Sequence, residues 1–175
     1  GHLPIRITDV QGPLDSTALI FGHNNFLMAM HTHPKAVHHL LQMVTDLTIE
    51  YVQAYRDLIH EYGSEFVPTI NYPWMPDGMG MQVAHDECVM ISPKMHDEFA
   101  VPYLNQISNA FNGVFIHSCG KWSHQIESLR KVRNLRGLEF GATEAPYGPM
   151  LDAFGGEIPL VMRVGLNRDI KFNGM

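Results

Sequence analysis

The sequence predicts a parallel α/β fold, and the order and character of its segments carry that prediction. Short apolar segments alternate with amphipathic ones along the 175 residues, as strands alternate with helices in successive βαβ units. The apolar segments do not alternate cleanly between apolar and polar residues, as expected of strands that are buried on both faces. Polar side chains follow the predicted strands at the edge where α/β proteins bind their ligands.

The first third of the chain is expected to hold one strand and one long helix. Residues 5–13 predict a strand, because isoleucines alternate there before a Gly-Pro pair breaks the pattern. The helix is expected to have Thr32 as its N-cap and Pro34 in its first turn. Apolar residues then recur at steps of three and four until Gly63, which favours the end of a helix.

The rest of the chain continues the alternation without an internal repeat. Strands are predicted over residues 64–74, 81–87, 113–120, 136–142 and 158–166. Helices are predicted over residues 92–111, 123–135 and 147–156, with Ser123 as a cap and with Pro102 kinking or dividing the first of them. Six strands make most of an eight-stranded barrel and cannot close it. The sheet is therefore either open or part of something longer.

Composition excludes several classes of protein. The hydrophobic share of 45% suits one globular domain over residues 1–175. Eighteen acidic residues against 12 basic ones argue against binding to nucleic acid, and no apolar run is long enough for a membrane span. Two cysteines make no disulfide framework, so we expect a reducing compartment, the cytoplasm.

A histidine and a cysteine stand at the end of one predicted strand. His117 and Cys119 are two positions apart, so their side chains point to the same face of the strand. Imidazole nitrogen and thiolate sulfur are both good zinc ligands, and Gly120 leaves room for a ligand or a loop to approach. The alternative is a hydrogen-bonded histidine beside an inert cysteine, because a zinc site needs at least one further protein ligand.

Other candidate site residues follow the neighbouring strands. Asp86 and Glu87 place two carboxylates at a strand end, where either could act as a base, anchor a substrate or bind a metal. Tyr72 and Trp74 offer an apolar wall for a large flat cofactor, and Glu139 is the third candidate cofactor contact. In each case the alternative is ordinary packing or loop structure. In a continuous strand, Glu87 would share one face with His85 while Asp86 takes the other.

Three stretches together resemble one enzyme superfamily. They are "DVQGP" at the start, "DECVMISPKMHDEFAVPYLNQI" in the middle and "FIHSCG" beyond it. This pattern is similar to the uroporphyrinogen decarboxylase (URO-D) superfamily, which also contains zinc- and corrinoid-dependent methyltransferases. The resemblance implies a TIM-type (β/α)8 barrel, present here as a truncated portion that is incomplete at its N-terminus and C-terminus.

The methyltransferase branch is the better match, because that branch carries His-x-Cys where this chain has His117 and Cys119. The resemblance implies a zinc ion bound by these two residues and by a further cysteine beyond Met175, with Asp86 or Glu87 as a fourth ligand or as a residue that orients the substrate. It implies methyl transfer between a corrinoid (cobalamin) and a thiol or similar small-molecule substrate. The expected partners are a corrinoid protein or free cobalamin, and a second copy of the chain in a homo-oligomer.

Two alternatives stay open. A decarboxylase acting on the acetate side chains of a tetrapyrrole would need clustered arginines at the barrel mouth, where this chain offers only Arg163 and Arg168. The decarboxylases also carry Trp-Thr-Leu after the Gly-Pro pair, where this chain has Leu14-Asp15-Ser16. The other alternative is an inactive portion of a barrel.

Overall fold

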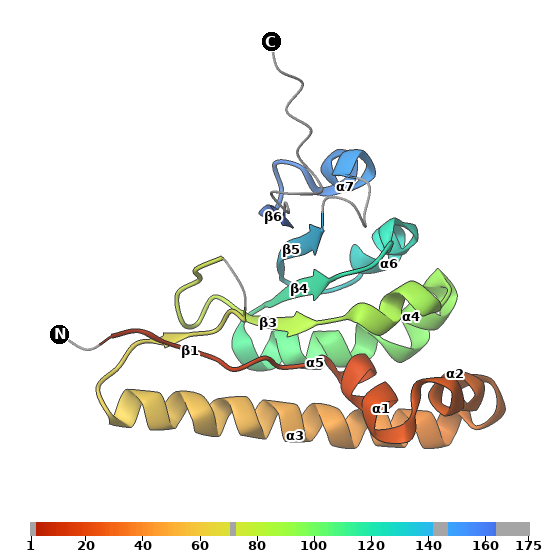
Figure 1. Ribbon diagram of the computed structural model, residues 1–175, viewed down its shortest axis with the longest axis horizontal. Coiled ribbons are helices and arrows are strands. Elements are labelled where there is room, and N and C mark those ends of the chain that lie inside the picture. The colour runs from red at the N-terminus through yellow and green to blue at the C-terminus, as the bar shows by residue number, and fades with distance from the viewer. Residues whose placement is uncertain (1–2, 71–72, 142–146, 164–175) are drawn as a thin grey trace, which may run out of the picture.

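The computed structural model describes residues 3–70, 73–141 and 147–163. Six parallel strands and the helices between them confirm a mixed α/β fold (Figure 1). The elements are β1 (Ile5–Arg6), α1 (Pro13–Phe21), α2 (His23–Thr32), α3 (Pro34–Glu61), β2 (Phe66–Val67), β3 (Met81–Ala84), η1 (Asp86–Met90), α4 (Pro93–Phe99), α5 (Val101–Phe111), β4 (Val114–Ser118), η2 (Ser123–Gln125), α6 (Ile126–Leu129), β5 (Leu135–Gly141), α7 (Tyr147–Phe154) and β6 (Leu160–Arg163).

The strands form a curved row that follows their order in the chain. One sheet has the order β3-β4-β5-β6, and β1 pairs with β2 beside it. Backbone contacts tie the two sheets together, because Ala84 forms a parallel bridge with Gln11 and the Gln82 amide donates to the Pro68 carbonyl over 2.9 Å. Among the described residues β6 does not pair with β1, so the row is open. This arrangement is consistent with part of a TIM barrel.

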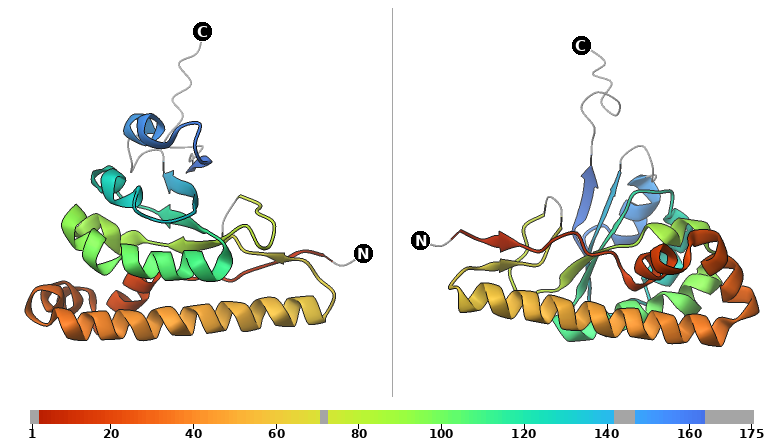
Figure 2. Two further views of the ribbon diagram at one scale, coloured as in Figure 1. Left: turned by 180° about the vertical axis from the view of Figure 1, so that it is seen from behind. Right: turned by 60° about the horizontal axis from the view of Figure 1, so that its bottom comes forward.

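The helices cover the outer side of this row. The long helix α3 lies along the base of the molecule, where α1 and α2 pack on one of its ends and α5 lies beside it (Figures 1 and 2). The stripe of α3 that packs against the core is made by apolar residues at helical spacing, namely Val37, Leu41, Val44, Val52 and Ile59. No helix in the described part of the chain is long and apolar enough to cross a membrane.

The structure differs from the sequence expectations at several element ends. Residues 13–32 form two helices that the pattern did not predict, so Thr32 ends α2 and His33 precedes α3. The helix expected over residues 92–111 is divided at Ala100, two residues before Pro102, as a proline inside a helix requires. The helix expected over residues 123–135 is shorter: the 3-10 turn η2 comes first, and α6 ends at Leu129.

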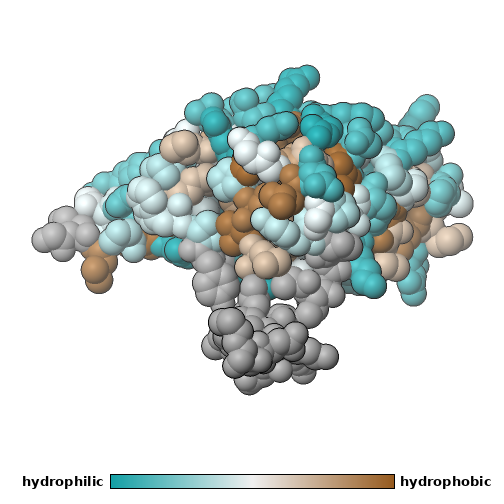
Figure 3. Space-filling model, turned by 90° about the horizontal axis from the view of Figure 1, so that it is seen from above, coloured by the Kyte–Doolittle hydropathy of each residue, from teal (hydrophilic) through white to brown (hydrophobic). Residues whose placement is uncertain are grey.

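Apolar side chains reach the surface near the open end of the row. Figure 3 shows hydrophobic side chains in the middle of the face seen from above, with hydrophilic ones around them. The strand β6 is the outermost strand of its sheet, and the side chains of Leu160 and Val161 on it are half-buried while Met162 is exposed. Within the described ranges no strand pairs with the outer edge of β6, and such an edge is a surface on which another strand can pair. Self-association of the chain stays a prediction.

Candidate metal centre

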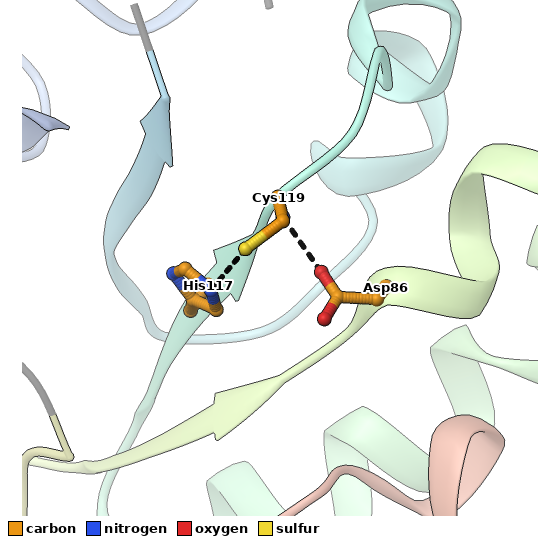
Figure 4. A group of neighbouring side chains, drawn as sticks. All are labelled: Asp86, His117 and Cys119. Atoms are coloured by element: carbon orange, nitrogen blue, oxygen red, sulfur yellow. Dashed lines mark hydrogen bonds between the residues drawn. The ribbon is translucent and has the colours of Figure 1, made fainter. Parts of the chain in front are cut away.

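The strand β4 carries His117 to the inner side of the row of strands. His117 lies opposite Ala84 of β3 and Glu139 of β5, and its side chain is almost fully buried. Cys119 directly follows the strand and is exposed. Because the two side chains share one face, His117 Nε2 lies 3.2 Å from Cys119 Sγ (Figure 4). The structure thus brings together the pair that the sequence singled out.

Asp86 joins this pair from the neighbouring strand. It is the first residue of η1, just beyond β3, and its Oδ1 accepts a hydrogen bond of 2.6 Å from the Cys119 amide. One ligand atom each from Asp86, His117 and Cys119 lie within 4.8 Å of one another (Figure 4). A carboxylate, an imidazole and a thiol at such distances form a donor set that suits a divalent metal ion.

A buried carboxylate lies on the other side of the His117 ring. Glu139 is inaccessible to solvent, and its Oε1 lies 3.6 Å from His117 Nδ1. Its Oε2 accepts a hydrogen bond of 2.5 Å from Gln82 Nε2, which fixes the carboxylate between β3 and β5. A carboxylate near one ring nitrogen orients the imidazole so that the other nitrogen is presented to a metal. Glu139 therefore lies where it can orient His117, and it is too deep to line an open mouth.

An arginine approaches the same sulfur from β6. Arg163 Nη2 donates to Cys119 Sγ over 2.9 Å, and its Nε lies 3.4 Å from Glu139 Oε1. Its guanidinium group places positive charge beside both a thiol and a carboxylate. Three neighbouring strands, β4, β5 and β6, therefore each supply a polar group to this edge of the sheet.

The second predicted carboxylate, Glu87, points elsewhere. The chain leaves the strand after Ala84 and turns into η1, so the expected strand geometry for residues 85–87 is wrong. Glu87 is nearly buried and pairs with His23 at the start of α2. The His85 ring faces His96 of α4, with 2.8 Å between their Nε2 atoms. Of these three residues only Asp86 reaches the metal donor set.

One carboxylate close to the metal donor set was not predicted from the sequence. Asp15 in the first turn of α1 is buried, and its two oxygens accept hydrogen bonds from the Asp86 and Glu87 amides over 2.6 and 2.9 Å. Burial raises the pKa of Asp15 to about 6. The only sequence signal was a charged residue in the otherwise weakly polar stretch after Gly12-Pro13.

The structure separates the candidate aromatic contacts from this site. Tyr72 lies outside the described residues. Trp74 lines a hollow of about 410 Å³ whose other walls include Phe115 and Leu135, at the points where β4 and β5 begin. Cys119 lies where β4 ends, so Trp74 and Cys119 belong to opposite ends of the strands.

The chain is similar to a known protein family over part of its length. The family model for uroporphyrinogen decarboxylase (URO-D) matches residues 6–67, which run from β1 to the end of β2. No curated protein matches the chain. The matched segment does not contain the donor set of Asp86, His117 and Cys119, so the match bears on the superfamily and leaves the reaction open.

Proposed function

Taking membership of the uroporphyrinogen decarboxylase superfamily as the premise, which the match to residues 6–67 supports, we propose that the chain provides the metal site of a zinc-dependent methyltransferase. The reaction would move a methyl group between a corrinoid and a thiol or a similar acceptor. The observation that carries the proposal is the convergence of Asp86, His117 and Cys119 at the carboxyl edge of a parallel sheet. Their ligand atoms come from two adjacent strands within a few ångströms.

The distances between the donor atoms suit zinc. Zn–S and Zn–N bonds of about 2.3 and 2.1 Å place the two donors of a tetrahedral site about 3.6 Å apart. His117 Nε2 and Cys119 Sγ are 3.2 Å apart, so a zinc ion needs only a small displacement of either side chain. Asp86 also comes within reach, so these three donors would leave one position of a tetrahedral site for the further cysteine that the resemblance implies or for a substrate.

The chain's own residues would hold and orient this site. His117 and Cys119 would bind through Nε2 and Sγ, while Glu139, whose Oε1 lies 3.6 Å from Nδ1, is placed where it can orient the imidazole. Arg163 lies close enough to Cys119 to hold an anionic group of a substrate beside the metal. When bound, zinc would supply a Lewis acid that lowers the pKa of a coordinated thiol.

The corrinoid enters this proposal through the family resemblance. Trp74 lies at the far end of the strands and Glu139 is buried behind His117, so neither is part of a surface at the metal site in the described residues. We therefore assign no corrinoid contact to either residue. A free cobalamin or a corrinoid protein would approach the carboxyl edge, where Cys119 is exposed.

The decarboxylase alternative finds less support in the placement of the arginines. Arg163 is the described arginine that lies at the donor set. Arg6 is bound to the Thr69 and Pro73 region, and Arg136 donates to the Asn112 carbonyl at the opposite end of the strands. Arg168 lies outside the described residues. A cluster of guanidinium groups for several carboxylates is thus absent from the described part of the chain.

Metal titration tests the proposal. Metal-free protein is titrated with Co²⁺, whose bond to a thiolate absorbs in the near ultraviolet, and with Zn²⁺ in competition with a chromophoric chelator. We expect one site per chain, lost in the His117→Ala/Cys119→Ala variant and retained in Cys88→Ala. Cys88 is the matched control, because it is the other cysteine and is buried against Ser118.

Transfer is measured with methylcobalamin and a small thiol, by the loss of the methylcobalamin absorbance. Loss of turnover in the His117→Ala/Cys119→Ala variant, with turnover retained in Cys88→Ala, is the expected result. A chain that binds neither Co²⁺ nor Zn²⁺ would contradict the proposal and would favour the inactive portion of a barrel.

A further inference from the structure

Asp15 connects the first helix to the turn that carries Asp86, across 71 positions of the chain. It lies on α1, three residues after the Gly12 amide that donates to the Ala84 carbonyl over 2.8 Å. Its Oδ2 accepts from the Asp86 amide and its Oδ1 from the Glu87 amide. The carboxylate therefore fixes the backbone at the first two residues of η1.

The contacts continue from this turn to the donor atoms. The Asp86 backbone amide donates to Asp15 Oδ2, while the Asp86 side chain accepts through Oδ1 from the Cys119 amide over 2.6 Å. The position of Asp86 thus sets the position of the loop after β4. Asp15 is itself no member of the three-residue donor set, so any effect that it has on a metal passes through Asp86.

The hydrogen bonds from the Asp86 and Glu87 amides require two acceptor atoms at position 15. Two adjacent amide groups point at the side chain, and a carboxylate meets both with one oxygen each. An asparagine of the same shape would turn its NH₂ group toward one of the two amides, where donor faces donor. Burying a carboxylate is costly unless its oxygens are hydrogen-bonded, and here the two amides provide that compensation.

We propose that Asp15 is a positioning residue of the metal centre, holding Asp86 and through it Cys119 in the geometry that binds the ion. The inference rests on the proposed function, since it assigns Asp15 a role in that same site. Removing a residue that orients a metal ligand typically weakens metal binding about 10- to 100-fold. We expect a loss of that size in Asp15→Asn.

A double-mutant cycle on metal binding tests the role. Co²⁺ and Zn²⁺ affinities and the Co²⁺ spectrum are measured for the wild type, Asp15→Asn, Asp86→Asn and the double variant. If Asp15 acts through Asp86, Asp15→Asn reproduces the altered visible spectrum of Asp86→Asn while the sulfur–Co²⁺ band is retained. The double variant should then bind no more weakly than Asp86→Asn alone.

The charge-matched control is Asp97→Asn. Asp97, on α4, is also a carboxylate that accepts two hydrogen bonds, one from Ser128 of α6 and one from Lys131 just after α6. This variant loses the same charge and should keep the wild-type Co²⁺ affinity and spectrum. Asp15→Glu is the second variant if Asp15→Asn does not fold, because it keeps the charge but moves both oxygens outward by one methylene; weaker binding is expected.

The outcomes separate the two claims. A wild type that binds no metal overturns the proposed function and the role of Asp15 with it. A wild type that binds metal, with unchanged affinity and spectrum in folded Asp15→Asn or Asp15→Glu, overturns the role of Asp15 alone. Losses that add fully in the double variant also overturn it, because they would show that Asp15 does not act through Asp86.

Discussion

Acid is expected to destabilise the protein through His96, a histidine on the outer side of the sheet. His96 on α4 is inaccessible to solvent, with its Nε2 facing His85 Nε2 at 2.8 Å and its Nδ1 facing Ser128 Oγ at 2.6 Å. Burial lowers the pKa of His96, Asp97 partly opposes this, and His124 and Lys131 add smaller decreases, so the pKa falls from 6.5 to about 4. The ring is therefore neutral in the folded protein at pH 7.

The magnitude follows from the difference in pKa between the two states. In the unfolded chain His96 takes up a proton below pH 6.5, whereas in the folded protein it stays neutral until about pH 4. Each pKa unit corresponds to about 1.36 kcal/mol, so the shift corresponds to about 3 kcal/mol. This contribution to stability is complete above pH 6.5 and is lost progressively as the pH falls toward 4.

Urea unfolding at several pH values between 7 and about 4.5 measures this loss. The comparison is between the wild type and His96→Gln, because titrating groups remote from His96 contribute equally to both and cancel in the difference. His85, which contacts His96, has its pKa lowered by burial more than by the charge of His96, and this burial is present in both proteins. Since glutamine does not titrate, the wild type should lose about 2–3 kcal/mol more than His96→Gln across this range. Parallel curves for the two proteins would refute the reasoning.

Two further predictions concern the contact between Gly12 and the end of β3, and the exposed thiol of Cys119. In Gly12→Ala the new Cβ would lie 2.6 Å from the Ala84 carbonyl oxygen, a backbone atom that cannot move without shifting β3. We therefore expect the free energy of unfolding, measured in urea, to fall by about 1–3 kcal/mol. An unchanged free energy of unfolding would contradict the close approach. In the native protein a thiol reagent should modify Cys119 and spare Cys88, because only Cys119 is exposed, and Zn²⁺ should slow the reaction. Equal modification of both thiols, or no protection by Zn²⁺, would contradict this placement.

The sequence predicts those parts of the molecule that depend on local spacing. The stripe on α3 repeats at helical steps because one face packs on the core along much of its length. The proximity of His117 and Cys119 follows from the period of two along a strand, which needs no knowledge of the rest of the fold. Pro102 divides a helix for an equally local reason, the missing amide and the bulk of its ring.

Contacts between segments that are far apart in the chain could not be predicted from local spacing. Asp15 and Asp86 are 71 positions apart, and nothing in either segment shows that one carboxylate holds the backbone of the other. The helices α1 and α2 escaped prediction because their apolar residues do not form one clean stripe: Leu19, Ile20 and Met28 are exposed. Trp74 was misplaced because the loop after β2 returns to the start of β3 rather than remaining at the carboxyl edge.

The geometry around His117 depends on one irregularity between β4 and β5. Val114 pairs with Leu135, but Phe115 pairs with Gly137. The register therefore advances by one residue, and Arg136 has no partner residue opposite it in β4. Without this advance His117 would face Leu138, because the register would continue one residue earlier. The shift places Glu139 beside His117 instead and turns its carboxylate to the inner side. Gly137 permits it, since a Cβ there would lie 2.3 Å from the Phe115 ring. A His-x-Cys pair at a strand end is thus not sufficient to build this centre, because its buried carboxylate depends on a bulge at the other end of the strand.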